Sequence, residues 1–161
     1  MSASTGAYAK SGAAEIRGII RTGELPPTGG RYRLDVVPDG EPRHGYPNMN
    51  DTVEVVELIA SGAQVMLFTT GRGSVVGSAL SPVVKVCANP DTYRRRSEDM
   101  DIDPGRILAG EASLDEVGDE IVEVIARTVH GEPTKSEALG HQEFQLGYKS
   151  FEPSGPARLP V

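Results

Sequence analysis

The chain has 161 residues, which is enough for one domain with a hydrophobic core and short for two. Sixteen basic and twenty-three acidic residues give a net charge of −7, which opposes general attraction to nucleic acid and to anionic membranes. No apolar run reaches the roughly 20 residues of a membrane span, and the N-terminal residues lack a secretory signal pattern, so we expect a cytoplasmic protein. The single cysteine, Cys87, excludes an internal disulfide.

The N-terminal third of the chain is rich in turns. Small and polar residues fill positions 1–14, and we expect this segment to be flexible. An isoleucine cluster at 16–20 indicates a strand or a tether, and residues 31–37 alternate apolar and polar side chains as a half-exposed strand does. Residues 38–50 contain several prolines and glycines, which predicts an irregular loop.

A strand–helix–strand unit is predicted at about residues 31–70. Asp51 and Glu54 form a capping-box pattern, an apolar stripe follows, and Gly62 is placed to end the helix. The helix would lead into a short apolar strand at 64–70. We therefore expect a right-handed βαβ unit whose two strands are parallel neighbours, which would bring the 38–50 loop beside the loop after residue 70.

The remaining elements complete an α/β fold. A second apolar run at 83–88 predicts a buried strand, and helices are predicted at 91–97, at 113–130 and from about 136. The sequence thus indicates a single three-layer α/β domain over residues 15–150, with a small, mostly parallel sheet flanked by helices. Residues 151–161, which include three prolines, are expected to form an extended tail.

Between the two apolar strands lies a glycine-rich loop, and strand ends in α/β sheets are where ligands usually bind. A dinucleotide fingerprint would need glycine in place of Val76 and a long helix afterwards, and a nucleotide-hydrolase loop would need a closing Gly-Lys-Ser/Thr; neither pattern is present. A surface turn with Arg72 in a salt bridge stays an alternative. The predicted anion site comprises Thr69, Thr70, Gly71, Arg72, Gly73 and Ser74.

Two further residues are candidates for acid–base chemistry. His44 titrates near neutral pH and lies in the loop expected to face Arg72, although it is equally consistent with a surface histidine. Lys85 interrupts an apolar strand, so it either lines a functional pocket or buries its stem and keeps its amine in water. Cys87 in the same strand is expected to be a core residue.

Other polar residues give weaker signals. Asp101, Asp103 and Glu111 could offer oxygen ligands to a metal, but the later ligands of an EF-hand are missing. The run of arginines at 94–96 is read as a solvated helix face, and nothing in the sequence around His141 indicates a role for it.

The central loop and its surroundings resemble the C-terminal region of the altronate/galactarate dehydratase family of sugar-acid lyases. The motif FTTGRGSVVG at 68–77 carries most of this resemblance, and shorter similarities follow the same order as in that family. These are YAKSG at 8–12, ASGAQ at 60–64, PVVKV at 82–86, MDID at 100–103 and GEA at 110–112.

The resemblance implies elimination of water from a polyhydroxy carboxylate to give a 2-keto-3-deoxy acid, with a divalent metal, iron(II) in the first instance. It also implies that the chain corresponds to about the last third of a full enzyme. We therefore expect a larger complementary catalytic subunit, a homo-oligomer, or both. A non-catalytic hydroxy-acid-binding module, a structural subunit, and a component of a related lyase acting on a sulfonated hydroxy acid stay open as alternatives.

Overall fold

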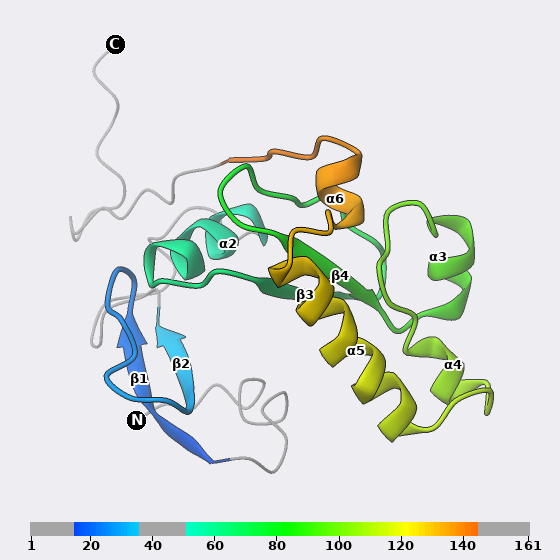
Figure 1. Ribbon diagram of the computed structural model, residues 1–161, viewed down its shortest axis with the longest axis horizontal. Coiled ribbons are helices and arrows are strands. Elements are labelled where there is room, and N and C mark those ends of the chain that lie inside the picture. Colours follow the sequence, from blue (N-terminus) through cyan, green and yellow to red (C-terminus); the bar gives the residue numbers. More distant parts are fainter. Residues whose placement is uncertain (1–14, 36–50, 145–161) are drawn as a thin grey trace, which may run out of the picture.

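The computed structural model describes residues 15–35 and 51–144. Two short parallel sheets organise this part of the chain (Figure 1). Strand β1 (Ile16–Arg21) pairs with β2 (Arg31–Asp35), and β3 (Met66–Thr70) pairs with β4 (Val83–Cys87). The predicted α/β class, with small parallel sheets flanked by helices, is confirmed. The segments expected to be flexible at 1–14, to form the 38–50 loop and to form the 151–161 tail lie outside the described residues.

The strand pairing within the predicted βαβ unit is wrong. The unit has the expected order of β2, α2 (Asp51–Ala60) and β3, but β2 pairs with β1 and β3 pairs with β4. A parallel pair needs only a connection long enough to return the chain. Residues 22–30 before β2 and residues 71–82 after β3 return the chain without a helix, the first stretch being shorter than the usual dozen residues, and each strand pairs with its other sequence neighbour.

A three-layer arrangement surrounds β4, whose five residues are all buried. Because neighbouring strand residues point to opposite faces, Val83 packs with Val55 of α2, whereas Val84 packs with Val117 of α5 (Leu114–Val129). The far edge of β4 pairs with Ile102 through an isolated parallel bridge. The strand is therefore covered on both faces and partly at its second edge, which matches its continuous apolar sequence.

Helix ends follow the local sequence signals. Ser113 and Glu116 form a reciprocal capping box at the start of α5, and Asn89 caps α3 (Pro90–Arg95) by accepting two backbone hydrogen bonds. Gly62 adopts a positive φ of 89° just after α2, as a helix-terminating glycine does. Two short helices, α4 (Gly105–Leu108) and α6 (Lys135–Ala138), complete the described fold.

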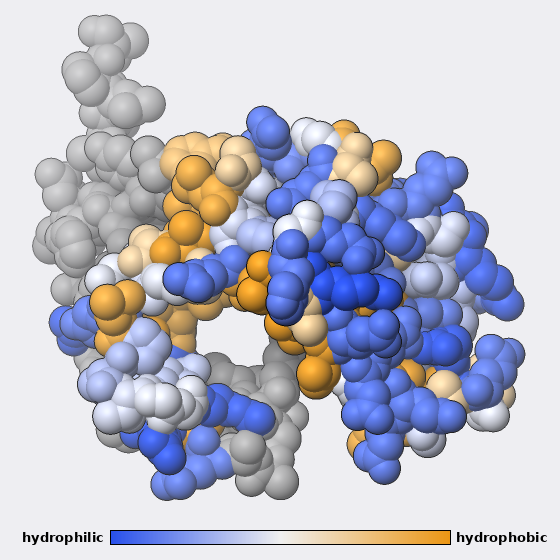
Figure 2. All heavy atoms as spheres, viewed as in Figure 1, coloured by the Kyte–Doolittle hydropathy of each residue, from blue (hydrophilic) through white to orange (hydrophobic). Residues whose placement is uncertain are grey.

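Hydrophilic and hydrophobic residues gather on different parts of the surface. Figure 2 shows a mostly hydrophilic surface over α3 and α5, and hydrophobic side chains gathered around α2 and the strands. None of the helices in the described ranges combines the length and the apolar composition that a membrane crossing requires.

The segment after α6 packs closely on the β3–β4 connection. A Cβ atom built on Gly77 would lie 2.5 Å from the backbone oxygen of His141, and the Gly77 N–H donates to Glu143 Oε2 at 3.0 Å. Only a residue without a side chain permits this approach. Gly77 therefore fixes where residues 141–143 dock.

We expect Gly77→Ala to lower the free energy of unfolding by about 1–3 kcal/mol, because the added methyl group must displace backbone rather than a flexible side chain. Gly118→Ala is the matched control, since its Cβ on the exposed face of α5 would meet nothing within 4 Å. That change should raise stability by up to about 1 kcal/mol through helix propensity. Urea titration of both variants measures the two effects, and equal stability of Gly77→Ala and the parent chain would contradict the docking role.

Candidate functional site

The loop after β3 is shaped by its own threonine. Thr70 Oγ1 accepts hydrogen bonds from the Arg72 N–H at 3.3 Å and from the Gly73 N–H at 3.1 Å. Gly73 has a positive φ of 85°, which this tight turn requires. Two of the N–H groups expected to face an anion, those of Arg72 and Gly73, are therefore engaged inside the loop, so an anion contact here relies more on side chains than the sequence indicates.

Arg72 extends from this loop at the carboxyl end of β3. Its side chain is exposed, and within residues 15–35 and 51–144 its guanidinium has no hydrogen-bond or ion-pair partner. The alternative of an Arg72 salt bridge on the surface is thus not seen in the described part of the chain. An exposed guanidinium at a strand end, with no partner among the described residues, is suited to bind a carboxylate through two parallel hydrogen bonds.

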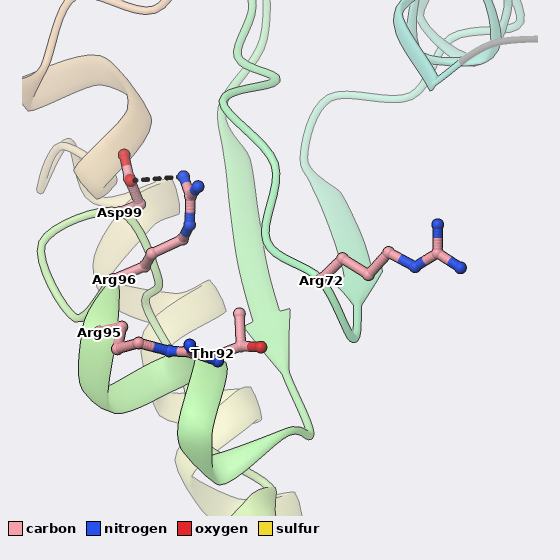
Figure 3. A pocket seen from close by; sticks show the side chains of 5 residues that line it. All are labelled: Arg72, Thr92, Arg95, Arg96 and Asp99. Atoms are coloured by element: carbon pink, nitrogen blue, oxygen red, sulfur yellow. Dashed lines mark ion pairs between the residues drawn. The ribbon is translucent and has the colours of Figure 1, made fainter.

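A pocket of about 530 Å³ opens between this loop and α3 (Figure 3). Thr92 in α3 is buried and donates its hydroxyl to the Gly71 carbonyl at 3.0 Å, which ties the helix to the loop. Arg95 and Arg96 add two guanidinium groups, against the single carboxylate of Asp99. The arginine run at 94–96 is therefore more than a solvated face, since two of its three members line this pocket.

Lys85 lies behind the loop and is fully buried. Its Nζ donates to the Ser74 carbonyl at 3.1 Å, lies 3.5 Å from His141 Nδ1, and is 4.0 Å from Asp99 Oδ1. Of the two alternatives for Lys85, a buried stem with its amine in water is not what the structure shows, because the amine has polar partners inside the protein. Lys85 does belong to a polar cluster next to the predicted loop.

Burial lowers the pKa of Lys85, and the nearby carboxylates of Asp99, Asp101 and Glu143 oppose that shift. Removal of the amine from water outweighs the attraction of these carboxylates, of which none forms a close ion pair with it. The Lys85 amine is therefore easier to deprotonate than an ordinary lysine.

His141 is the residue that the sequence failed to indicate. It lies 56 positions after Lys85 in sequence, and only the docking of its segment on Gly77 brings the two side chains together. No local pattern carries that information. His44, in contrast, lies outside the described residues, so its predicted position facing Arg72 stays a prediction.

Two of the three acidic residues considered as metal ligands, Asp101 and Asp103, have structural partners in the described part of the chain. Asp101 accepts hydrogen bonds from the N–H groups of Lys85 and Lys135, and Asp103 accepts one from Gly105. In the part of the chain that the structure describes, no three His, Cys, Asp or Glu side chains gather as a metal site would require. The described residues alone therefore do not fit the expected metal. Cys87 is buried, as predicted for a core residue.

Comparison of the sequence with known proteins identifies a family. A family model for the C-terminal part of D-galactarate/altronate dehydratase matches residues 1–151. Among curated relatives, the beta subunit of (2R)-sulfolactate sulfo-lyase from Chromohalobacter salexigens is 39% identical over 131 residues, which cover 77% of this chain and 34% of that protein.

Two Escherichia coli enzymes are also similar. Galactarate dehydratase (L-threo-forming) is 31% identical over 78% of this chain and 22% of its own length. Altronate dehydratase is 27% identical over 89% of this chain and 26% of its own length. The chain thus spans about a third or less of these relatives.

The lowered pKa of Lys85 predicts a pH-dependent stability. Folding favours the neutral amine, so the unfolded chain binds more protons between the lowered pKa and about 10.4, where an unfolded lysine titrates. Within that window the stability of the parent chain should rise with pH relative to Lys85→Met, which cannot titrate there. Urea unfolding of both proteins at several pH values between 7 and 10 measures the difference. A difference that stays flat or falls with pH would show that the amine is not destabilised by burial.

Proposed function

The chain belongs to the family of C-terminal domains of D-galactarate/altronate dehydratases, and on that premise we propose that it binds the substrate carboxylate of a sugar-acid lyase. The observation that carries the proposal is the Arg72 guanidinium, which lies at the carboxyl end of a parallel strand pair, beside a pocket of about 530 Å³. The reaction is the elimination of water from an altronate- or galactarate-like acid to give a 2-keto-3-deoxy acid.

This reaction makes a clear demand on the carboxylate end of the substrate. Removal of the proton beside a carboxylate places negative charge on its oxygens, so fixed cationic donors must stabilise the enediolate that forms. Arg72 would hold the carboxylate through two parallel hydrogen bonds and meet that growing charge. The hydroxyls of Thr69, near the end of β3, and of Ser74, on the loop, would add further donors; Thr70 shapes the loop from within.

Lys85 holds the loop from behind through the Ser74 carbonyl. This contact makes it a positioning residue for the Arg72 loop, and its lowered pKa would also suit a proton acceptor if the loop moved aside. A direct proton transfer by Lys85 stays a prediction, as does the role of His44 as acid, base or ligand.

We further propose that the rest of the catalytic site comes from a larger complementary polypeptide. The region shared with this chain makes up only 34%, 22% and 26% of the three relatives, so each relative is about three to five times longer than that region. The ligands of the proposed iron(II) would lie mainly in that polypeptide, because the described residues contain no cluster that could hold the ion.

A second candidate is a component of a lyase that releases sulfite from a sulfonated hydroxy acid. The relative at 39% identity is named as the beta subunit of a sulfolactate sulfo-lyase, which supports this alternative and the division into subunits. Both reactions remove the proton beside the carboxylate and differ only in the group that leaves, so the Arg72 role is common to them. A binding module or structural subunit without turnover stays the third alternative.

Arg72→Lys tests the carboxylate role. We expect affinity for galactarate to fall roughly tenfold, because an ammonium group cannot reproduce the planar pair of hydrogen bonds. Isothermal titration calorimetry measures the change. Arg94→Lys is the control, since Arg94 on α3 pairs with Asp91 and does not line the pocket. Unchanged binding by Arg72→Lys would remove the clamp from the proposal.

Turnover distinguishes the candidate functions. The chain should co-purify with a larger polypeptide, and the complex with added ferrous ion should convert galactarate or altronate to a 2-keto acid. Sulfite release from sulfolactate would instead support the second candidate. Ligand binding with no product from any of these acids would assign the chain to the non-catalytic class.

A further inference from the structure

The positive charges around the pocket fall into two groups. Arg72 comes from the loop after β3, whereas Arg95 and Arg96 come from the last turn of α3 and the residue after it. In Figure 3 the Arg72 side chain extends away from α3, and the Arg96 side chain turns toward Asp99. A single carboxylate at Arg72 would therefore leave the α3 arginines unused.

The α3 arginines are held in place but keep donors available. Among the described residues, Arg95 uses only its Nε–H, which it donates to the Asp91 carbonyl at 3.1 Å, and its two terminal amino groups have no partner there. Arg96 Nη1 lies 4.0 Å from Asp99 Oδ2, which is an ion pair too long for a hydrogen bond. An anion that enters the pocket would gain charge-assisted hydrogen bonds that the protein does not itself satisfy.

Gly73 links the two groups of charges. A Cβ atom at this position would lie 2.8 Å from Arg96 Cδ and 3.4 Å from Thr92 Cγ2. Since glycine leaves this space open, the stem of Arg96 packs directly on the loop that carries Arg72. The loop and α3 thus form one continuous wall, which fixes the spacing between the two cationic groups.

We propose that Arg95 and Arg96 bind a second anionic group at the far end of the substrate, so that this pocket selects hydroxy acids with two negative ends. The pocket volume of about 530 Å³ lies in the range of small-molecule sites. Three guanidinium groups against one carboxylate leave a net charge of +2 on the lining, which matches a dianion. The inference rests on the proposed function, in which Arg72 binds the first carboxylate.

Galactarate and galactonate are suitable probes, because they share one carbon skeleton and differ by a carboxylate at the far end. We expect the full chain, with any polypeptide that co-purifies, to bind galactarate roughly tenfold more tightly than galactonate in calorimetry. Arg96→Ala and Arg95→Ala should each reduce that preference and leave galactonate affinity unchanged. Arg96→Lys should restore part of it, and Arg94→Ala on the same helix should have no effect.

The possible outcomes separate this inference from the proposed function. Arg72→Ala should weaken both acids together, because both carry the first carboxylate. Equal affinity for the two acids, with both still sensitive to Arg72, would overturn the second anion subsite and preserve the carboxylate clamp. The same conclusion would follow if Arg95→Ala and Arg96→Ala weakened both acids equally. Failure of the parent chain to bind either acid would overturn both ideas.

Discussion

The described fold depends on how the connection between β3 and β4 satisfies its backbone polar groups. Parallel strands are usually joined through a helix, which supplies its own hydrogen bonds, but residues 71–82 return the chain without one. Their carbonyl and N–H groups therefore need partners from elsewhere. Lys85 reaches the Ser74 carbonyl, Ser136 reaches that of Val76, and Glu143 accepts from Gly77. These distant contacts give the loop a defined shape at the place where a ligand would enter.

Burying the Lys85 amine to make one of these contacts costs free energy, because the charged amine is removed from water. Desolvation lowers the pKa of Lys85, and its nearest carboxylate, on Asp99, lies 4.0 Å away. A serine or asparagine would satisfy a carbonyl at less cost, so the hydrogen bond to Ser74 alone does not explain why an amine stands at this position. Asp99 is also the partner of Arg96 in the pocket, so a single carboxylate lies between the buried amine and Arg96.

Features that depend on residues close together in sequence could be predicted, whereas features that depend on residues far apart in sequence could not. Capping pairs such as Ser113 with Glu116 lie within one helical turn, and the helices that they begin were predicted correctly. The burial of β4 could likewise be predicted from its own five residues, which are mostly apolar. Strand pairing is not local, because β2 could pair on either side, and the choice of β1 depends on the short connection before it. The same reason hides His141, whose meeting with Lys85 requires the whole fold.

The loop motif was recognised from its residues, but fewer of its backbone N–H groups are available to an anion than its glycines indicate. Glycine-rich loops usually bind anions through backbone N–H groups, and here Thr70 occupies two of these donors. The side chains that line the neighbouring pocket supply cationic groups instead, from Arg72 on the loop, Arg95 at the end of α3 and Arg96 just after it. Side-chain guanidinium groups can be spaced to match the two ends of a ligand, which adjacent N–H groups cannot. In the proposed role, a wall of this kind would select a substrate by its length and charge, and the groups that move protons would lie on the opposite wall.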